Sequence, residues 1–283
     1  MIKEIEYMAI PSCLEVSNGD AKLIIPTEFG PRVLFYGLDG GENVFGWHPE
    51  VAVDTELGTW KPYGGHRLWM APENMHLSYA PDNVPVGYVV NDDLSITLTS
   101  GIEPGTDLQK VITVTLDPAG ADVQVDHQIR NRGASPVEIS VWALTIMRPG
   151  GEAIVPNEPL ESYGGKTLLP VRTMALWPYT DFTDPRWFFD KHHIALKCDE
   201  TIHHPQKFGV LSKQGWAAYK MDDIVFTKRF DAMSDAVHPD LNSNTEIYTA
   251  GEFIEVETLS PIKVVGPGEC VEHREKWELV SHI

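Results

Sequence analysis

Two glutamates that stand two residues apart, Glu255 and Glu257, are the residues of this chain best placed to do chemistry together. They lie in a stretch that reads as a β-strand. Side chains alternate along a strand, so both acids share a face with Phe253, while Ile254 and Val256 point the other way. The apolar face can be core. The acidic face then meets water, a cation, or a polar ligand whose hydroxyls donate to carboxylates.

A loop-rich stretch near the first quarter of the chain combines charged, polar and aromatic side chains. Its members of interest are His66, Arg67, Trp69, Glu73 and His76. This combination suits a sugar, because the ring stacks on an aromatic face while the polar groups satisfy its hydroxyls. Binding residues concentrate on loops held by a rigid scaffold. The alternative is a surface loop in which Arg67 pairs with a neighbouring acid and Trp69 is core.

Basic side chains are scarce in this chain, and three of them stand among aromatic residues. They are Lys207, Lys228 and Arg229. One interpretation is a pocket wall with a cationic contact, which makes Lys207 a candidate for substrate binding. The other is a set of surface salt bridges at the rim of a sheet.

Other polar motifs predict little. The doublets His192-His193 and His203-His204 place neighbouring side chains on opposite faces of a strand, so neither pair easily ligates one ion. His127 is in phase with apolar residues and is expected in the core with a satisfied hydrogen bond. The glycine pairs lack the context of a phosphate loop, and no Gly-x-Ser-x-Gly elbow occurs. The sequence therefore predicts no metal site and no cofactor.

The net charge and the distribution of apolar residues limit the classes of partner and the location that the sequence predicts. The chain has 22 Lys and Arg against 41 Asp and Glu, a formal net charge of −19, so it repels phosphate backbones and anionic lipids. Neither nucleic acid nor a membrane is expected as a partner. The N-terminus lacks the apolar run of a secretory signal, and we expect a cytoplasmic protein. Cys13, Cys198 and Cys270 fit reduced structural thiols.

The remaining sequence consists mainly of short alternating segments between glycines and prolines. Residues 93–99, 112–116 and 123–129 each place apolar side chains at every second position, which is typical of half-buried strands. Residues 137–147 read as a strand buried on both faces. Two stretches, 187–204 and 216–238, are free enough of breakers to hold a short helix, although 224–227 look like strand. We predict an all-β, mainly antiparallel sandwich with few short helices, in a single domain spanning residues 1–283.

Four segments in order carry a resemblance to a known family. They are LIIPTEFGPRVL at 23–34, GHRLW at 65–69, WALT followed by PGG within 142–151, and the end segment from EVE at 255–257 through PGE at 267–269 to Trp277. Together they resemble the galactose mutarotase-like superfamily, and the chain is most similar to an aldose-1-epimerase-like branch of it. The resemblance implies a β-supersandwich with a sugar site on the concave face of one sheet.

The resemblance also implies a mechanism. In true aldose epimerases a carboxylate takes the proton from the anomeric hydroxyl and a histidine protonates the ring oxygen, so that the ring opens and closes again as the other anomer. The context Val256-Glu257-Thr258 matches the family's glutamate, which makes Glu257 the expected base. Glu255, about 6.5–7 Å away along the strand, would raise the proton affinity of one of the pair. Arg67 matches the arginine that holds a sugar hydroxyl.

The sequence departs from that family at the histidine. Trp142 stands at about the place of the catalytic histidine, so either His66 or His76 supplies the acid from another direction, or the site binds sugar without epimerising it. The first hypothesis is an aldose 1-epimerase-like isomerase, and the second is a non-catalytic carbohydrate-binding protein. A lyase or hydrolase for uronic-acid polymers is a third reading, carried only by analogy of fold.

Overall fold

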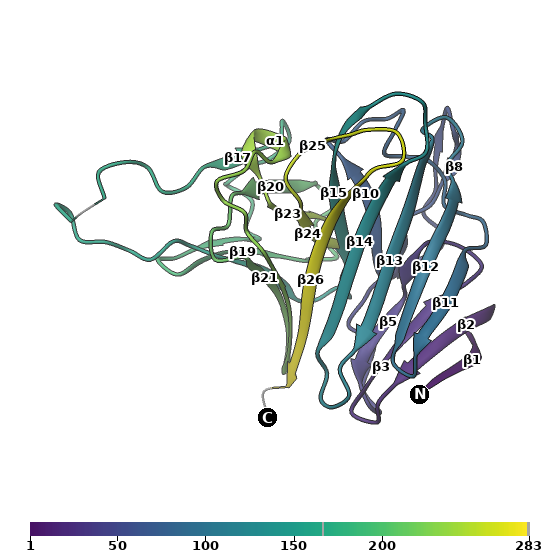
Figure 1. Cartoon of the computed structure of the whole chain (residues 1–283). Helices are drawn as coiled ribbons and strands as arrows, with labels where there is room; N and C mark the ends of the chain where they lie inside the picture. The colour runs from purple at the N-terminus through teal and green to yellow at the C-terminus, as the bar shows by residue number, and fades with distance from the viewer. Residues whose placement is uncertain (166, 282–283) are drawn as a thin grey trace.

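Almost all the regular structure of the chain is antiparallel β-sheet. The computed structural model describes residues 1–165 and 167–281, and in that part the chain forms 26 strands and one four-residue helix. Figure 1 shows the strands gathered into sheets that stack against one another. The all-β class predicted from the alternating segments is confirmed.

The largest sheet has ten strands and includes the end of the chain. In spatial order its strands are β11 (Gly87–Asp92), β12 (Ser95–Ile102), β13 (Leu108–Leu116), β14 (Val123–Asn131), β26 (Cys270–Ser281), β22 (Ile224–Phe230), β21 (Trp216–Met221), β16 (Glu152–Pro156), β19 (His193–Lys197) and β18 (Trp187–Phe189).

The second sheet has eight strands and carries the residues with candidate chemistry. In spatial order they are β17 (Met174–Leu176), β20 (Gln206–Val210), β23 (Thr245–Ala250), β24 (Phe253–Leu259), β15 (Val137–Ile146), β10 (His66–Ala71) and β4 (Arg32–Val33), with β25 (Lys263–Val265) paired to β15. Segments from the first, middle and last parts of the chain thus lie side by side in it.

Smaller elements complete the fold. A four-stranded sheet contains β1 (Ile2–Tyr7), β2 (Ile10–Ser17), β3 (Ala21–Pro26) and β5 (Phe35–Leu38), and two ribbons pair β6 (Trp47–His48) with β9 (Tyr63–Gly64) and β7 (Val53–Thr55) with β8 (Gly58–Trp60). The helix α1 (Pro239–Asn242) has left-handed backbone at Asp240 and Leu241. In the described part of the chain no helix is long and apolar enough to cross a membrane.

The main core lies between the eight-stranded and ten-stranded sheets. From β24, Ile254 and Val256 are fully buried, and they belong to one cluster with Val125 of β14 and Trp277 of β26. Burying an aliphatic side chain of this size contributes roughly 1.5–3 kcal/mol. The alternation of β24 is therefore fixed, because a shift of one residue would bury its acids in this core and expose its apolar side chains.

The two stretches considered for helices hold strands instead. Residues 187–204 contain β18 and β19, and residues 216–238 contain β21 and β22. The strand expected at 224–227 falls within β22 and is confirmed. Each of these strands pairs with a neighbour in the ten-stranded sheet, and these long-range pairings outweigh the weak local preference for a helix.

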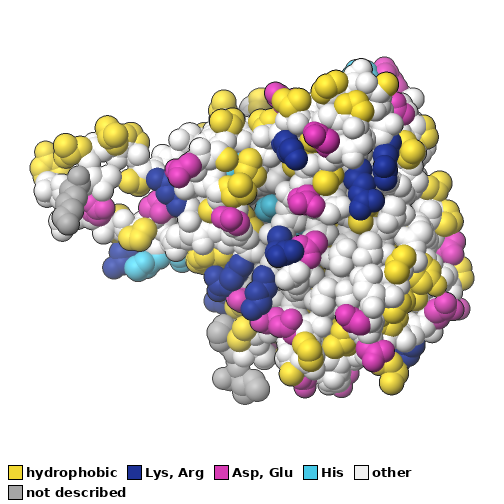
Figure 2. Space-filling model, in the orientation of Figure 1, with side chains coloured by type: hydrophobic (Ala, Val, Ile, Leu, Met, Phe, Trp, Pro, Cys, Tyr) yellow, Lys and Arg dark blue, Asp and Glu magenta, His cyan; other side chains and the backbone are white. Residues whose placement is uncertain are grey.

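The surface mixes charges of both signs. On the face shown in Figure 2, lysine and arginine side chains lie among acidic ones, and apolar side chains gather on the segment that projects at the left. Leu160, Leu168 and Leu169 between β16 and β17 are among the exposed apolar residues. These leucines take no part in the core.

Candidate functional site

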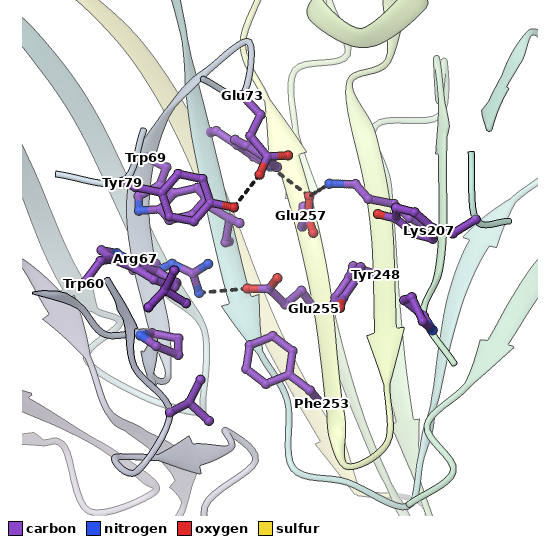
Figure 3. A pocket seen from close by; sticks show the side chains of 17 residues that line it. Trp60, Arg67, Trp69, Glu73, Tyr79, Lys207, Tyr248, Phe253, Glu255 and Glu257 are labelled. Carbon is purple, nitrogen blue, oxygen red and sulfur yellow. Dashed lines mark hydrogen bonds and ion pairs between the residues drawn. The ribbon is translucent and has the colours of Figure 1, made fainter. Parts of the chain in front are cut away.

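A cavity of about 500 Å³ opens on the face of the eight-stranded sheet that points away from the core. Its size lies within the roughly 300–1,000 Å³ typical of small-molecule sites. Figure 3 shows the glutamates of β24 lying between an aromatic wall on one side and Lys207 and Tyr248 on the other. The aromatic residues that line the cavity are Trp60, Trp69, Tyr79, Trp142, Tyr179, Tyr248 and Phe253.

The aromatic wall comes from β8, β10, β15 and the loop after β10. The rings of Trp60 and Trp69 lie 4.9 Å apart, and Tyr79 packs edge-on against both. Trp69 also meets Trp142 edge-on at 5.5 Å. Such edge-to-face contacts fix the rings in place along the cavity wall.

Arg67 and Glu255 form one ion pair of the site. Arg67 Nη1 donates to Glu255 Oε1 at 2.7 Å, and the guanidinium lies over the rings of Trp60 and Trp69 at 5.4 and 4.8 Å. The backbone before Arg67 depends on Gly65, because a Cβ there would lie 2.0 Å from the carbonyl oxygen of Val33. That glycine lets β10 lie against β4.

Glu257 is the second carboxylate, and it is held from two sides. Trp142 Nε1 donates to Glu257 Oε2 at 2.8 Å, and Lys207 Nζ donates to the same oxygen at 3.2 Å. The other oxygen, Oε1, is buried and accepts no hydrogen bond from the described residues. Burial raises the pKa of Glu257, with Lys207 acting against this and the charge of Glu255 adding to it.

A third buried carboxylate, Glu246, shares the same cation. It stands directly across from Glu257 on β23, and its Oε2 lies 2.9 Å from Lys207 Nζ. Burial raises the pKa of Glu246 well above its usual range, and Glu257 adds to that effect although Lys207 opposes it. Burial disfavours the ammonium of Lys207, yet the two carboxylates outweigh it and raise its pKa. One cation between two buried acids favours a proton on one of them.

The structure brings most of the sequence-predicted site residues together. The cavity is lined by Arg67, Trp69, Glu73, Trp142, Lys207, Glu255 and Glu257. The face predicted for Glu255, Glu257 and Phe253 is confirmed. Of the three scarce cations, Lys207 alone among them lines the cavity. Lys228 is buried between the sheets beside Glu275, and Arg229 forms a surface pair with Glu278.

The two histidines considered for the acid do not line this cavity. His66 is on β10, where alternation turns it away from Arg67 and into the core; it is wholly buried and its ring packs against Trp277. His76 is exposed and pairs with Glu56 at 2.9 Å. The structure therefore corrects the expectation that either histidine faces Glu257. In the described residues 1–165 and 167–281, no histidine lines the cavity.

His66 instead belongs to a hydrogen-bonded group inside the sandwich. His66 Nε2 lies 2.7 Å from His127 Nε2, and its Nδ1 lies 2.9 Å from Thr145 Oγ1. His127 Nδ1 is 3.0 Å from the carbonyl oxygen of His273. Neutral tautomers satisfy this chain, with His127 Nδ1 donating to that carbonyl and Nε2 accepting from His66. The prediction of a buried, hydrogen-bonded His127 is confirmed.

The same group includes a buried ion pair behind the site. Lys228 Nζ lies 2.8 Å from Glu275 Oε1 and donates to the carbonyl oxygens of Ala143 and Val256, at 2.9 and 3.2 Å. His66, His127 and Glu275 bring their ligand atoms close together. Their nitrogens are at hydrogen-bond distance, whereas two nitrogens on one zinc ion lie about 3.4 Å apart. This group suits a hydrogen-bond network better than a metal.

Comparison with known proteins finds similarity in structure alone. No protein-family model and no curated protein matches the sequence. Among solved structures, a galactose mutarotase-like protein from Lactobacillus casei is 12% identical with a TM-score of 0.59, over 95% of this chain and 100% of that one. The shared architecture over nearly the full length of both chains decides the fold. The chain has the galactose mutarotase-like fold.

Two further structures show the same mutarotase-like fold. A candidate mutarotase from Salmonella typhimurium is 11% identical with a TM-score of 0.59, over 99% of this chain and 97% of that one. A candidate aldose 1-epimerase from Escherichia coli K12 is 14% identical with a TM-score of 0.54, over 94% and 98%. The resemblance proposed from the four sequence segments is thereby confirmed at the level of fold.

Sequence reasoning missed several cavity residues of this mutarotase-like fold. The sequence-based prediction lacks Trp60, Tyr79 and Tyr248, which line the cavity, and Glu246, which is buried beside Lys207 without lining it. A signal existed for the last two, since alternation along β23 places Glu246 and Tyr248 on one face and Ile247 on the other. What the sequence lacks is the pairing of β23 with β24, which puts Tyr248 into the cavity and Glu246 across from Glu257.

Proposed function

We propose that the cavity binds a saccharide and that Glu257 acts as a base in the interconversion of its anomers. The observation that carries the proposal is the juxtaposition of two carboxylate–cation pairs with an aromatic wall in one cavity. Charged pairs donate hydrogen bonds to sugar hydroxyls and accept them, and aromatic residues that line the cavity, such as Phe253 and Tyr248, suit an apolar sugar face. The fold shared with mutarotase-like proteins supports the same proposal.

The proposed chemistry begins at Glu257. Its free Oε1 would take the proton from the anomeric hydroxyl, and a pKa raised by burial brings a carboxylate closer to the neutral range in which a base works best. The ring oxygen needs a proton donor. We assign it to Tyr179 or Tyr248, which line the cavity with hydroxyls that make no hydrogen bond to the described residues. Burial raises the pKa of both, which keeps them protonated.

A non-catalytic sugar-binding protein is the second candidate function. Glu257 has no exposed surface, and Trp142 and Lys207 already hold one of its oxygens. A substrate reaches Oε1 only if a neighbouring side chain rotates. Glu255 keeps 7% of its surface exposed, so the Arg67–Glu255 pair is the more accessible polar contact for a ligand that is bound but not converted.

Anomer exchange separates the two functions. Freshly dissolved aldoses would be followed by polarimetry and by NMR exchange spectroscopy, with the wild type, Glu257→Gln, Tyr179→Phe and Tyr248→Phe. Glu138→Gln, an exposed position on β15 outside the cavity, is the matched control. An epimerase accelerates exchange of at least one aldose, and Glu257→Gln and one tyrosine variant lose that acceleration while Glu138→Gln keeps it.

Calorimetry with the same sugars completes the test. Binding without acceleration would establish the sugar-binding function and reject the catalytic one. If no saccharide binds and none exchanges faster than in buffer, both candidates are rejected.

A further inference from the structure

A buried histidine beside the cavity faces two carboxylates. One follows it closely in the sequence and the other comes from near the end of the chain. His48 ends β6, Glu50 follows it in the next turn, and Glu252 lies in the turn between β23 and β24. The three ligand atoms, one nitrogen and two carboxylate oxygens, lie within 4.8 Å of one another. The fold has therefore gathered a set of one imidazole and two carboxylates at a single point.

The distances in this group are too long for hydrogen bonds. His48 Nδ1 lies 3.7 Å from Glu252 Oε1 and 4.0 Å from Glu50 Oε1, whereas an N–H···O bond spans about 2.7–3.2 Å. Two ligand atoms held about 2.1 Å from a common ion lie roughly 3–4.2 Å apart, depending on the angle between them. The gap fits an ion better than a shared proton.

His48 itself lacks a partner. Only 5% of the residue is exposed, and its Nε2 is buried without a hydrogen bond to any residue of the described ranges. The other nitrogen, Nδ1, faces the two carboxylates from beyond hydrogen-bond distance, and in a ring that carries its proton on Nε2 the lone pair of Nδ1 would be free to bind a cation placed between them. The ring is held in place by Phe253, 5.1 Å away between ring centres.

The two glutamates can adjust around this fixed nitrogen. Their side chains are 66% and 60% exposed, so both can rotate to complete a coordination geometry at little cost. We propose that His48, Glu50 and Glu252 bind one divalent cation beside the cavity. Imidazole with carboxylates suits zinc, and manganese next, better than calcium, which prefers oxygen alone.

A cation here would join two turns that flank the cavity. Phe253, next to Glu252, and Val51, next to Glu50, both line it. The ion would therefore fix the positions of these two side chains. The site stands apart from Glu255 and Glu257, and the proposal does not depend on what the cavity binds.

The sequence offers a matched control. His76 and Glu56 form an exposed pair at 2.9 Å without a third ligand among the described residues. The neutral variants Glu50→Gln and Glu252→Gln remove one ligand each at an exposed position, and Glu56→Gln removes the acid of the control pair. Because all three positions are exposed, we expect the variants to fold.

The experiment is a calorimetric titration of chelator-treated protein with Zn²⁺, Mn²⁺ and Ca²⁺, with melting temperatures recorded at saturation. We expect the wild type to bind one equivalent of Zn²⁺ at this site and to melt at a higher temperature with it. Glu50→Gln and Glu252→Gln should each lower the affinity for this Zn²⁺ ion by at least roughly 10–100-fold, which is the cost of losing a residue that only hydrogen-bonds to a metal ligand. Glu56→Gln should bind as the wild type does. Failure of the wild type to bind, or equal binding by Glu252→Gln, overturns the proposal.

Discussion

Replacing Lys207 with methionine tests how the buried charges beneath the cavity are balanced. Lys207 Nζ lies 2.9 Å from Glu246 Oε2 and 3.2 Å from Glu257 Oε2, and both glutamates are fully buried. Methionine keeps most of the length and apolar volume of the side chain and removes the charge. The variant therefore leaves two buried acids without their cation.

The expected loss follows from these distances. At an effective dielectric constant of about 20, the ion pair of Lys207 with Glu257 at 3.2 Å supplies roughly 5 kcal/mol of attraction, most of which offsets the desolvation of the charges. Removing one partner of a buried pair costs about 3–5 kcal/mol. We expect Lys207→Met to lower the free energy of unfolding by that amount.

Glu246→Gln is the matched comparison. It removes the carboxylate whose pKa burial raises well above its usual range and leaves the ion pair of Lys207 with Glu257 intact. We expect the free energy of unfolding to change by less than about 1 kcal/mol. Glutamine is neutral, as the protonated Glu246 is, so the substitution leaves no buried charge without a partner.

The contribution of Glu246 to the pH dependence has a definite sign. The native state holds a proton on Glu246 at pH values where the unfolded chain has released it, so native stability falls as the pH rises above about 4.5 and towards the raised pKa of Glu246. Glu246→Gln should flatten this dependence. Urea unfolding followed by fluorescence of the eight tryptophans at several pH values measures both effects. An equal loss in Glu246→Gln and Lys207→Met at pH 7.5 would refute the reasoning.

Three more predictions concern the core and the site. Lys228→Met should cost about 3–5 kcal/mol of unfolding free energy, because Glu275 is then buried without its cation, and adding Glu275→Leu should recover most of it in urea unfolding. Burial lowers the pKa of His273 to about 3, so its contribution to stability is complete above pH 6.5 and is lost below it by up to about 1.4 kcal/mol per pH unit. Denaturation curves at pH 7.5 and 5.5 should show this in the Glu246→Gln variant, where the opposing titration of Glu246 is absent, and a flat profile in that variant would contradict it. Trp142→Phe keeps an aromatic ring but removes the donor to Glu257, at a cost of about 1.5–3 kcal/mol, and calorimetry should show weaker sugar binding, whereas unchanged stability would exclude a structural role for this bond.

The alternation of side chains along a strand explains which site residues could be predicted from the sequence. The faces of β24 followed from its sequence alone, because Ile254 and Val256 could be buried only if Glu255 and Glu257 pointed the other way. The same rule applied to β10 would have turned His66 into the core. The glycines and the proline around that strand favour a loop in the sequence and conceal its alternation. The structure has six consecutive buried residues at this place.

Register explains what the sequence could not supply. Glu246 stands across from Glu257 only because β23 pairs with β24 in one alignment, and Lys207 reaches both because β20 lies on the far side of β23. Strand order in a sheet assembled from distant segments depends on which faces pack together. No local pattern in this chain encodes that choice.

The sequence by itself determined the class of structure, the alternation of the strands and the kinds of side chain available for binding a sugar. Those properties are local, because side-chain direction changes at every residue of a strand. Tertiary structure decided which polar groups share a cavity and which are sealed in the core. Arg67 and His66 are neighbours in sequence, yet the first lies over tryptophans in the cavity and the second against Trp277 between the sheets. Packing of the two sheets set that difference, since only one face of β10 can meet the core.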